Sequence, residues 1–338
     1  MKNIEIVLQD LLQPSEALIR DMETLEGDIL ILGVGGKIGP SLARLAKQAI
    51  DRCGKATKVI GVSRFSDPGL QEQLEKEGII THAADLLNSD DLKMLPQAGN
   101  VLYLAGTKFG TTGKEAFTWA MNTYLPGLVA EKYRNSRFVV YSTGNVYPFT
   151  PVTSGGADEN TIPAPIGEYG QSCLGRERIF QYFSEKYKIP LLIYRLNYAN
   201  DLRYGVLVEV AKSVMGRQPI NLQTGHANVI WQGDANEITL RSMLKCSLPG
   251  KILNVTGPET VSIRWLAEEF GKVFNTEPVL TGEEQPAALL SNAGESFRLF
   301  GYPKVSLKQM IALTAEWLVQ NGDTINKPTH FQEREGRF

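Results

Sequence analysis

The sequence has few cysteines and no long apolar run. Its three cysteines, Cys53, Cys173 and Cys246, lie far apart and form no C-x-x-C pair. Such scattered thiols exclude a disulfide framework and are typical of a reducing compartment. No stretch approaches the roughly 20 apolar residues that span a bilayer, and the N-terminus lacks the basic start of a signal peptide. We therefore expect a cytoplasmic protein without a membrane partner.

An excess of one charge is also missing. The 35 basic and 37 acidic residues give a formal net charge of −2, with no block of like charges. A nucleic-acid partner needs a basic patch or stripe, so we expect none. The three histidines, His82, His226 and His330, are scattered without metal-ligand spacing. No metal site is therefore predicted.

Short apolar runs alternate with helical patterns through the first 195 residues. Helices are expected at 70–76, 114–134 and 168–187, and the apolar runs do not alternate with polar residues, which is typical of strands covered on both faces. This order predicts an α/β fold of Rossmann type, a doubly wound parallel sheet. The expected strands are 28–32, 58–62, 79–83, 101–104, 137–142 and 190–194.

The chain divides into three parts by pattern. Residues 1–26 are expected to form an N-terminal helical extension, with a helix over 12–26 and a start signal at Pro14–Ser15. Residues 27–195 are expected to form the Rossmann domain, and residues 196–338 mainly a smaller C-terminal lobe. Whether 226–256 returns to the Rossmann domain stays open at this stage. In the lobe, helices are expected at 206–215, 234–245, 263–274 and 307–320.

A glycine-rich turn follows the first expected strand. Gly33, Gly36 and Gly39 form G-x-x-G-x-x-G between that strand and a helix. This spacing allows a tight turn, close approach of the backbone to a pyrophosphate, and tight contact between helix and strand. The start of the helix then offers free N–H groups to the phosphates. We expect a nicotinamide dinucleotide here, contacted also by Lys37 and Ile38.

The end of the second expected strand bears on the choice of cofactor. It carries Ser63 and Arg64, where an acidic residue would bind the adenosine ribose hydroxyls of NAD. Arg64 can pair with a 2′-phosphate or stack on adenine. Asp85 and Leu86, after the third strand, are placed to contact the adenine. The sequence favours NADP, with NAD as the alternative.

Further motifs follow in a specific order. Together with the glycine turn, they resemble the extended short-chain dehydrogenase/reductase family, the NAD(P)-dependent epimerases and dehydratases, from about residue 27 to 317. The resemblance implies that Leu104, Ala105, Gly106 and Asn122 border the cofactor. The motifs are L-A-G at 104–106, Asn122, S-T-G-N-V-Y at 142–147, Y-G-Q-S at 169–172, L-N-V-T-G at 253–257 and F-G-Y-P at 300–303.

The same resemblance implies three catalytic positions. The family uses a Ser or Thr, a Tyr, and a Lys four residues after the Tyr, which correspond here to Thr143, Tyr169 and Cys173. The lysine binds the nicotinamide ribose, and its charge lowers the pKa of the tyrosine. A cysteine with an ordinary pKa of about 8.5 is mostly neutral at pH 7 and cannot act as an ammonium.

Three interpretations of Cys173 compete. In the first, it is a small buried apolar residue in a cofactor-binding protein without ordinary turnover. In the second, another cation, Arg176 or Lys108, replaces the lysine. In the third, the thiol reacts covalently, although no partner histidine lies near it in sequence. Arg176 follows Tyr169 by seven positions and therefore lies on the same helix face.

The resemblance further implies a sugar-like or nucleotide-sugar substrate held between the lobes. Arg203 could clamp a carboxylate or phosphate, whereas Arg195 is expected to cap the sixth strand structurally. We predict an NAD(P)-dependent epimerase, dehydratase or reductase with Tyr169 as acid/base. The alternative is a non-catalytic NAD(P)-binding regulatory or scaffold protein. The candidate substrate residues are Lys108, Tyr147, Arg176, Asn197, Tyr198 and Arg203, and Tyr204 is also expected beside the cleft.

A homodimer is also implied by the resemblance. The helices 114–134 and 168–187 would pair across a two-fold axis into a four-helix bundle. Packing on the protein's own sheet uses only one face of each helix. The apolar residues available for the partner are Phe117, Met121, Leu125, Leu128, Phe180 and Phe183.

Overall fold

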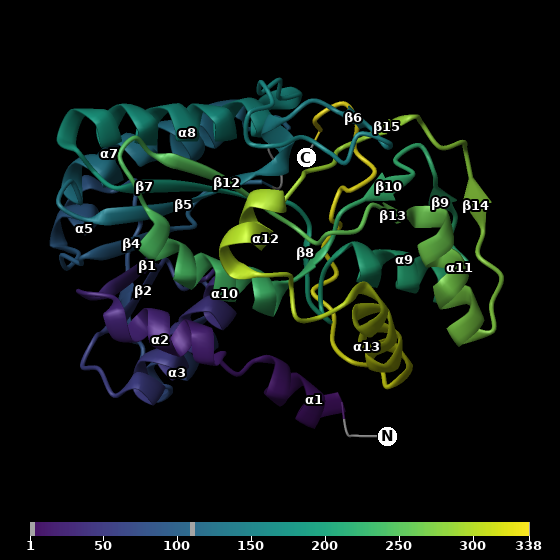
Figure 1. Ribbon diagram of the computed structural model, residues 1–338, viewed down its shortest axis with the longest axis horizontal. Coiled ribbons are helices and arrows are strands. Elements are labelled where there is room, and N and C mark those ends of the chain that lie inside the picture. The colour runs from purple at the N-terminus through teal and green to yellow at the C-terminus, as the bar shows by residue number, and fades with distance from the viewer. Residues whose placement is uncertain (1–3, 109–111, 338) are drawn as a thin grey trace.

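The computed structural model describes residues 4–108 and 112–337. In this part of the chain, seven parallel strands form one sheet in the order β12-β7-β5-β4-β1-β2-β3 (Figure 1). This confirms the predicted doubly wound α/β fold of Rossmann type. The strands are β1 (Ile29–Leu32), β2 (Val59–Ser63), β3 (Ile80–Ala83), β4 (Asn100–Tyr103), β5 (Arg137–Thr143), β7 (Leu191–Leu196) and β12 (Lys251–Val255).

The strand order reverses between β1 and β4. Leu32, the last residue of β1, pairs with Val62 of β2 on one side and with Tyr103 of β4 on the other. The chain runs outward from β1 to β2 and β3, then returns to β4 and continues outward the other way. In open α/β sheets this switch point leaves a crevice at the carboxyl ends of the strands, where ligands bind.

Two helical layers cover the sheet, above and below it in Figure 1. Ile29 and Ile31 of β1 face one core, and Leu30 and Leu32 face the other, as the two-residue period of a strand requires. All four are fully buried. The first core includes α2 (Glu16–Thr24), α3 (Gly39–Cys53), α4 (Pro68–Lys76) and α10 (Gln232–Ser242); the second includes α5 (Ser89–Met94), α7 (Leu125–Lys132) and α8 (Gly167–Tyr187).

The predicted helix 114–134 is interrupted. It consists of α6 (Glu115–Trp119), a π-helical turn over 120–124, and α7. Asn122 lies in that turn, fully buried; its side-chain oxygen accepts from the Thr107 amide and its nitrogen donates to the Thr107 carbonyl, each at 2.9 Å. The turn therefore holds the loop after β4. Single π-turns of this kind are frequent at functional sites.

The predicted helix over 12–26 is present as the shorter α2, and a second helix that was not predicted precedes it. The extension contains two helices, α1 (Ile4–Leu11) and α2, separated by residues 12–15. Ser15 caps α2, because its hydroxyl oxygen accepts from the Leu18 amide at 3.1 Å. The same hydroxyl donates to Glu237 of α10 at 2.5 Å, and this bond attaches the extension to the Rossmann layer.

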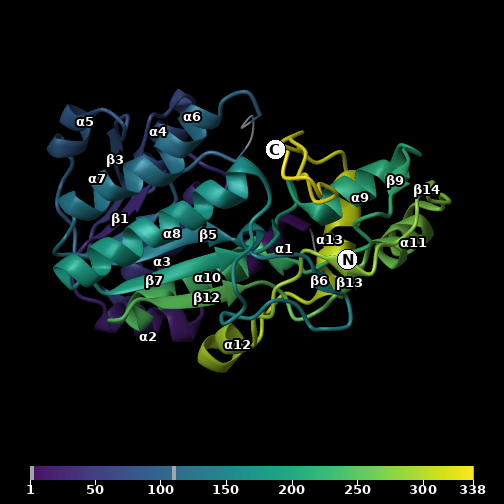
Figure 2. The same cartoon turned by 90° about the horizontal axis from the view of Figure 1, so that it is seen from above.

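The C-terminal lobe has its own core beside the sheet (Figure 2). It packs around α9 (Val206–Met215), α11 (Ile263–Phe274) and α13 (Leu307–Val319), while α12 (Gly294–Phe300) lies against β12. None of the described helices is long and apolar enough to cross a membrane. Short strands complete this region: β6 (Thr150–Pro151), β8 (Ala199–Asn200), β9 (Ile220–Asn221), β10 (His226–Ala227), β11 (Ile230–Trp231), β13 (Val261–Ser262), β14 (Leu280–Thr281) and β15 (Ala287–Ala288).

The C-terminal segment 327–337 runs from the lobe toward the start of α8. Phe331 is buried in the core of the lobe, and the amide and hydroxyl of Thr329 donate to Glu209 at 2.8 and 2.6 Å. Gly336 lies directly against Gly167, the first residue of α8. The tail is therefore a structured connection between the two lobes.

Candidate active site

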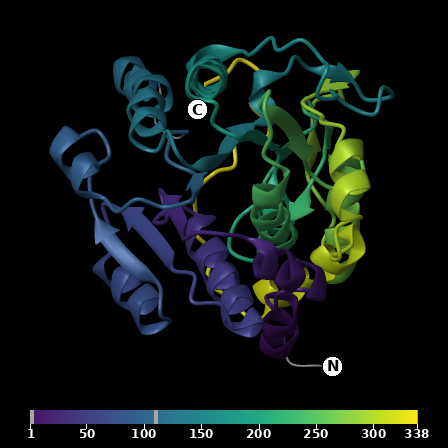
Figure 3. The same cartoon turned by 60° about the vertical axis from the view of Figure 1, so that its left-hand side comes forward.

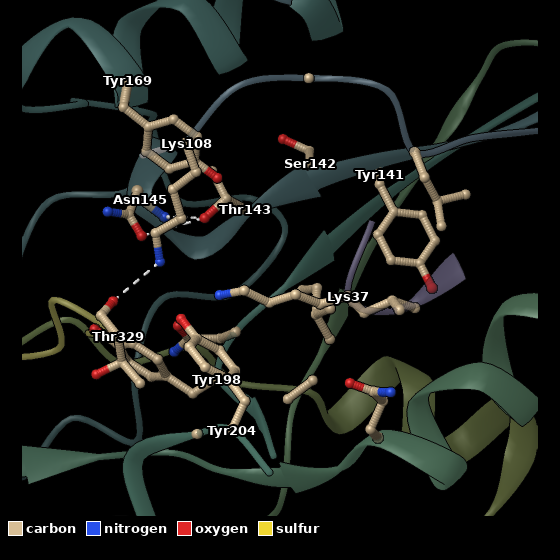
Figure 4. A pocket seen from close by; sticks show the side chains of 18 of the residues that line it. Lys37, Lys108, Tyr141, Ser142, Thr143, Asn145, Tyr169, Tyr198, Tyr204 and Thr329 are labelled. Atoms are coloured by element: carbon tan, nitrogen blue, oxygen red, sulfur yellow. Dashed lines mark hydrogen bonds between the residues drawn. The ribbon is translucent and has the colours of Figure 1, made fainter. Parts of the chain in front are cut away.

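A cavity of about 250 Å³ opens at the carboxyl ends of the central strands, between the two lobes (Figure 4). The Rossmann side contributes residues from the glycine turn, the loop after β4, the end of β5 and α8. The lobe contributes residues that follow β7, together with the C-terminal tail. The lining includes Lys37, Ile38, Leu104, Gly106, Lys108, Thr143, Asn145, Tyr169, Arg176, Asn197, Tyr198, Tyr204, Gln232 and Thr329.

The glycine turn has no room for side chains at its outer positions. Gly33 has a φ of +93°, and a Cβ there would lie 2.8 Å from the Ala105 nitrogen at the end of β4. A Cβ at Gly39 would collide with the Val34 carbonyl. A Cβ at Gly36 would meet only the Gly33 carbonyl oxygen at 3.4 Å, so this position keeps open space in front of the backbone. The turn fits a pyrophosphate in these respects.

The first turn of α3 is open to an anion. Its N-cap residue, Ile38, has no side-chain oxygen that could cap the free N–H groups, which therefore remain available to phosphate. Next to it, the Lys37 ammonium lies 3.2 Å from the centre of the Tyr204 ring. Burial, with the charges of Lys108 and Lys327, lowers the pKa of Lys37 to about 7. Lys37 and Lys108 both point into the cavity (Figure 4).

Tyr169 and Thr143 meet at the other end of the cavity. Thr143 is the last residue of β5, and its hydroxyl oxygen accepts from the Asn145 amide at 3.2 Å. Tyr169 comes from the first turn of α8. Burial raises the pKa of the Tyr169 phenol, and the lowering effects of the Arg176 charge and of a hydrogen bond with Thr143 do not offset it. The phenol is therefore protonated at neutral pH and can donate to a substrate oxygen.

The matching family model is that of the NAD dependent epimerase/dehydratase family, over residues 29–200. That match spans half of the chain. The chain belongs to this family. A comparison with the curated proteins finds no match.

Solved epimerases share the fold. UDP-glucose 4-epimerase from Thermotoga maritima, in a structure with UDP-glucose, superposes with a TM-score of 0.70 at 17% identity, covering 87% of this chain and 99% of that one. UDP-glucuronic acid 4-epimerase from Bacillus cereus, with UDP-glucuronic acid and NAD, gives 0.70 at 21% over the same shares. An epimerase from Methanothermobacter thermautotrophicus gives 0.72 at 18%, over 90% and 96%.

At Cys173, the resemblance described above implies a lysine. The cysteine side chain is fully buried in a small apolar cluster with Val146, Tyr147 and Ala157. It does not belong to the residues that line the cavity. Burial raises the pKa of the thiol, so the sulfur carries no charge at neutral pH.

The Arg176 guanidinium lies one turn of α8 after Cys173. Arg176 is 6% exposed, and it donates to the Tyr141 carbonyl at 2.9 Å and to the Asn122 side-chain oxygen at 2.7 Å. A Cβ on Gly106 would collide with it. A fixed positive charge therefore borders the cavity behind Tyr169, between α8 and the loop after β4.

Lys108 supplies a second cation at this end. Its Nζ lies 6.0 Å from the centre of the Tyr169 ring and donates to the Thr329 carbonyl at 3.3 Å (Figure 4). Burial lowers the pKa of Lys108 to about 8, although the charge of Glu209 opposes the shift. Tyr204, which was expected near the substrate cleft, lines this cavity. Thr329 was not among the predicted site residues, since a polar tail carries no motif.

The predicted adenosine residues lie outside the cavity. Ser63, at the end of β2, lies against the glycine turn: a Cβ on Gly35 would collide with the Ser63 hydroxyl. Arg64 is exposed. Asp85 is exposed, and its carboxylate accepts from the Leu87 amide at 3.0 Å. Leu86 is buried in the second core.

Two predicted substrate residues have other surroundings. The Tyr147 hydroxyl accepts from Arg195 at 2.6 Å and donates to Asn254 at 2.8 Å, inside the protein. Arg195 also pairs with Glu177 through two hydrogen bonds of 2.6 and 2.9 Å, which connects β7 to α8. Arg203 is exposed and lines a different cavity, which shares Lys37 and Gln232 with the first. Among the described residues, no cluster of His, Cys, Asp and Glu could hold a metal ion.

Proposed function

We propose that this chain is an NAD(P)-dependent epimerase, dehydratase or reductase acting on a sugar-like substrate. The observation that carries the proposal is the convergence of Tyr169, Thr143 and Lys108 on one cavity that also reaches the glycine turn. The neighbouring solved epimerases hold UDP-sugars and NAD.

In this proposal, Tyr169 is the acid/base group and Thr143 hydrogen-bonds the same substrate oxygen. The phenol is protonated in the free protein, so in the direction of carbonyl reduction it is the proton donor to that oxygen, and in the direction of alcohol oxidation the phenolate would take up the hydroxyl proton. Developing negative charge on the oxygen is stabilised by two donors already in place, which is the electrostatic contribution expected of such a site. A general acid/base group of this kind contributes about 10²- to 10⁴-fold in rate.

Arg176 is proposed to supply the fixed charge of the missing lysine. Its two hydrogen bonds to the Tyr141 carbonyl and to Asn122 hold it in place, and its charge lowers the pKa of the phenol. Lys108 is proposed to contact the substrate, because its ammonium lies in the cavity beside the tyrosine ring. An anionic substrate group, such as a sugar carboxylate, matches the two lysines that face the same space.

The dinucleotide would be held by the glycine turn, the first turn of α3 and Lys37. Ser63 and Arg64 would bind its adenosine end, with NADP preferred, and residues 104–106 would border its nicotinamide end. When bound, it supplies a hydride acceptor or donor at the substrate carbon. The chain's own residues orient the substrate, exclude water and hold the proton at the Tyr169 oxygen.

A second candidate function rests on Cys173. The Cys173 side chain is buried in an apolar cluster, and the pKa of the Tyr169 phenol is raised. In this second proposal the protein binds a dinucleotide without turnover, as a regulatory or scaffold protein. The structured tail between the lobes fits a stable binding module equally well.

The test is a screen for turnover with wild type and Tyr169→Phe. Free sugars, sugar acids and UDP-sugars are incubated with NADPH, NADH, NADP or NAD, and products are followed by absorbance at the nicotinamide band and by chromatography. We expect turnover of one class, a loss of about 10²-fold or more in kcat for Tyr169→Phe, and little change in KM. Tyr302→Phe, an exposed tyrosine outside the cavity, is the control. Cofactor binding without turnover of any substrate would support the second candidate, and a fully active Tyr169→Phe enzyme would refute the catalytic assignment.

A further inference from the structure

The C-terminal tail, residues 327–337, returns from the smaller lobe to the Rossmann side of the cleft. Phe331 is 1% exposed in the core of the lobe, and the Thr224 hydroxyl donates to the Gln332 carbonyl at 3.3 Å. The yellow end of the chain then lies beside the teal start of α8 (Figure 3). The part of the chain that the family model matches ends at residue 200, so this match assigns no role to the tail.

Thr329, within this tail, lines the candidate active site. Its amide and its hydroxyl donate to the Glu209 carboxylate of α9 at 2.8 and 2.6 Å, and these two bonds fix the residue in place. Its carbonyl oxygen accepts from Lys108 Nζ at 3.3 Å (Figure 4). The same Nζ lies 6.0 Å from the centre of the Tyr169 ring. A continuous set of contacts therefore leads from α9 through the tail to the proposed acid/base group.

The tail meets the Rossmann side again at the start of α8. Gly336 and Gly167 lie backbone to backbone, with φ values of +77° and +74°, which side chains rarely allow. A Cβ on Gly336 would lie 2.5 Å from the Ile166 carbonyl oxygen, and a Cβ on Gly167 would collide with the Gly336 backbone. Gly167 precedes Tyr169 by two residues in α8. Both meeting points of the tail are therefore close to this tyrosine, one in space and one along the helix.

The charge of Glu209 also acts on Lys108. Burial lowers the pKa of Lys108 to about 8, and the charges of Cys173 and Glu209 oppose this shift. Because burial raises the pKa of the Cys173 thiol, the sulfur is uncharged at neutral pH, and the Glu209 carboxylate is the one of the two that favours the ammonium form there. The basic groups that Lys108 faces act in the opposite direction, since its charge lowers the pKa of Lys37 and His330.

We propose that Glu209 and Thr329 are positioning residues, which hold the Lys108 ammonium beside Tyr169 so that it can bind a substrate oxygen. This role rests on the proposed function, in which Lys108 contacts the substrate. A lysine ammonium sits on a flexible four-carbon stem. A carbonyl acceptor that is itself fixed therefore reduces the freedom that Lys108 loses when the substrate binds. Without the Glu209 carboxylate, this carbonyl loses its anchor, and a larger share of the amine is uncharged.

The first test measures Lys108 without any substrate. The full-length protein is labelled with trace acetic anhydride over a range of pH, and the labelled peptides are quantified by mass spectrometry. We expect a midpoint near pH 8 for Lys108 in wild type. Glu209→Gln should lower the midpoint, so that labelling at pH 7 is about threefold faster. Thr329→Val, which loses only the hydroxyl bond, should shift it less in the same direction. Glu335→Gln, an exposed carboxylate of the same tail, is the matched control and should behave as wild type.

The second test separates positioning from a merely structural role. With a substrate found in the screen, kcat/KM is measured for Glu209→Gln, for Lys108→Met and for the double variant. We expect Glu209→Gln to lower kcat/KM about tenfold in the wild-type background and to have no further effect in the Lys108→Met background, because Glu209 acts through Lys108. Losses that add in the double variant would show that Glu209 acts independently of Lys108 and would overturn the proposal.

The labelling result does not depend on turnover, so this proposal and the proposed function fail separately. An unchanged Lys108 midpoint in both Glu209→Gln and Thr329→Val would refute the role of the tail, even in an active enzyme. A lowered midpoint in a protein that turns over no substrate would support the contact through the tail and count against the proposed function alone. Melting temperatures of all variants are measured alongside. If Glu209→Gln does not fold, Thr329→Val carries both tests, with the same expected directions.

Discussion

The Lys37 ammonium lies 3.2 Å from the centre of the Tyr204 ring. Lys37 comes from the glycine turn of the Rossmann domain, and Tyr204 comes from the loop before α9 in the other lobe. The contact therefore joins the two lobes across the candidate active site. It also holds a cation beside the expected phosphate site before any ligand binds, although burial and two neighbouring lysines work against the charge.

This arrangement predicts pH-dependent binding of anions. The pKa of Lys37 is lowered to about 7 and that of Lys108 to about 8, so both lose their charge as the pH rises through this range. We expect the affinity for NADPH to fall between pH 6.5 and pH 9, and binding at pH 8 to take up protons. Calorimetry in buffers of different ionisation enthalpy measures the uptake. Lys37→Met should reduce both effects, whereas the exposed Lys272→Met should change neither.

The same shifts predict the pH dependence of stability. Unfolded lysines titrate near a pKa of about 10.4, so between about pH 7 and pH 10 the unfolded chain binds more protons than the folded chain at these two positions. Their contribution to the free energy of unfolding therefore rises with pH over that range. Urea unfolding at pH 7 and pH 9 should show a smaller rise for Lys37→Met than for wild type. An identical rise in both proteins would contradict the assigned pKa of Lys37.

Restoring the family's lysine should damage this protein. Cys173 is fully buried in an apolar cluster, and the Arg176 guanidinium already lies near it in the helix. Cys173→Lys buries a second cation without a partner, and we expect a loss of about 3 kcal/mol or more in the free energy of unfolding together with lower turnover. Cys173→Ala, the control, should cost only about 1 kcal/mol. A stable Cys173→Lys enzyme with a higher kcat and an optimum at lower pH would show that the missing lysine limits an otherwise ordinary site.

Arg64 should decide the preference between the two cofactors. It is exposed at the end of β2, where no acidic residue is present to bind the ribose hydroxyls. We expect NADPH to bind about tenfold more tightly than NADH, and Arg64→Ala to remove the difference by weakening NADPH alone. Fluorescence titration with both nucleotides measures this. Arg134→Ala, an exposed arginine that precedes β5 at the amino ends of the strands, should leave the ratio unchanged. An unaltered preference in Arg64→Ala would move the selectivity to another residue.

Much of the Rossmann domain could be predicted because its signals are local. Each apolar run of four to seven residues became a strand within one or two residues of its expected ends, and the glycines of the turn mark where β1 meets α3. Helix α1 was missed, because Pro14 and Ser15 indicated the start of α2 but gave no sign of a separate helix before it.

The site was only partly predictable for a different reason. Thr143 and Tyr169 carry motif positions, whereas Thr329 reaches the cavity through tertiary contacts between the lobes. Tyr147 was misleading, since its motif position is genuine but its hydroxyl is used by Arg195 and Asn254. The sequence also offers no way to foresee that Arg203 faces a second cavity.

A homodimer remains a prediction, with a corrected set of contacts. Leu125 and Phe180 cannot reach a partner, because they are 0% and 2% exposed in the protein's own core. The apolar residues available on the same helices include Phe117, Tyr124 and Tyr182, which are 44%, 61% and 56% exposed. The expected pairing of these helices across a two-fold axis would bury them in a self-complementary interface.

We expect light scattering to give the mass of a dimer at micromolar concentration. The double variant Tyr124→Asp/Tyr182→Asp should give the mass of a monomer, because dimerisation would bury the new carboxylates in the interface. Val319→Asp, on the exposed side of α13, is the control and should stay dimeric. The monomeric variant should keep its circular dichroism spectrum, since both tyrosine side chains lie outside the protomer's core. A wild-type protein that is monomeric at all concentrations, or a double variant that remains dimeric, would exclude this helical face as the interface.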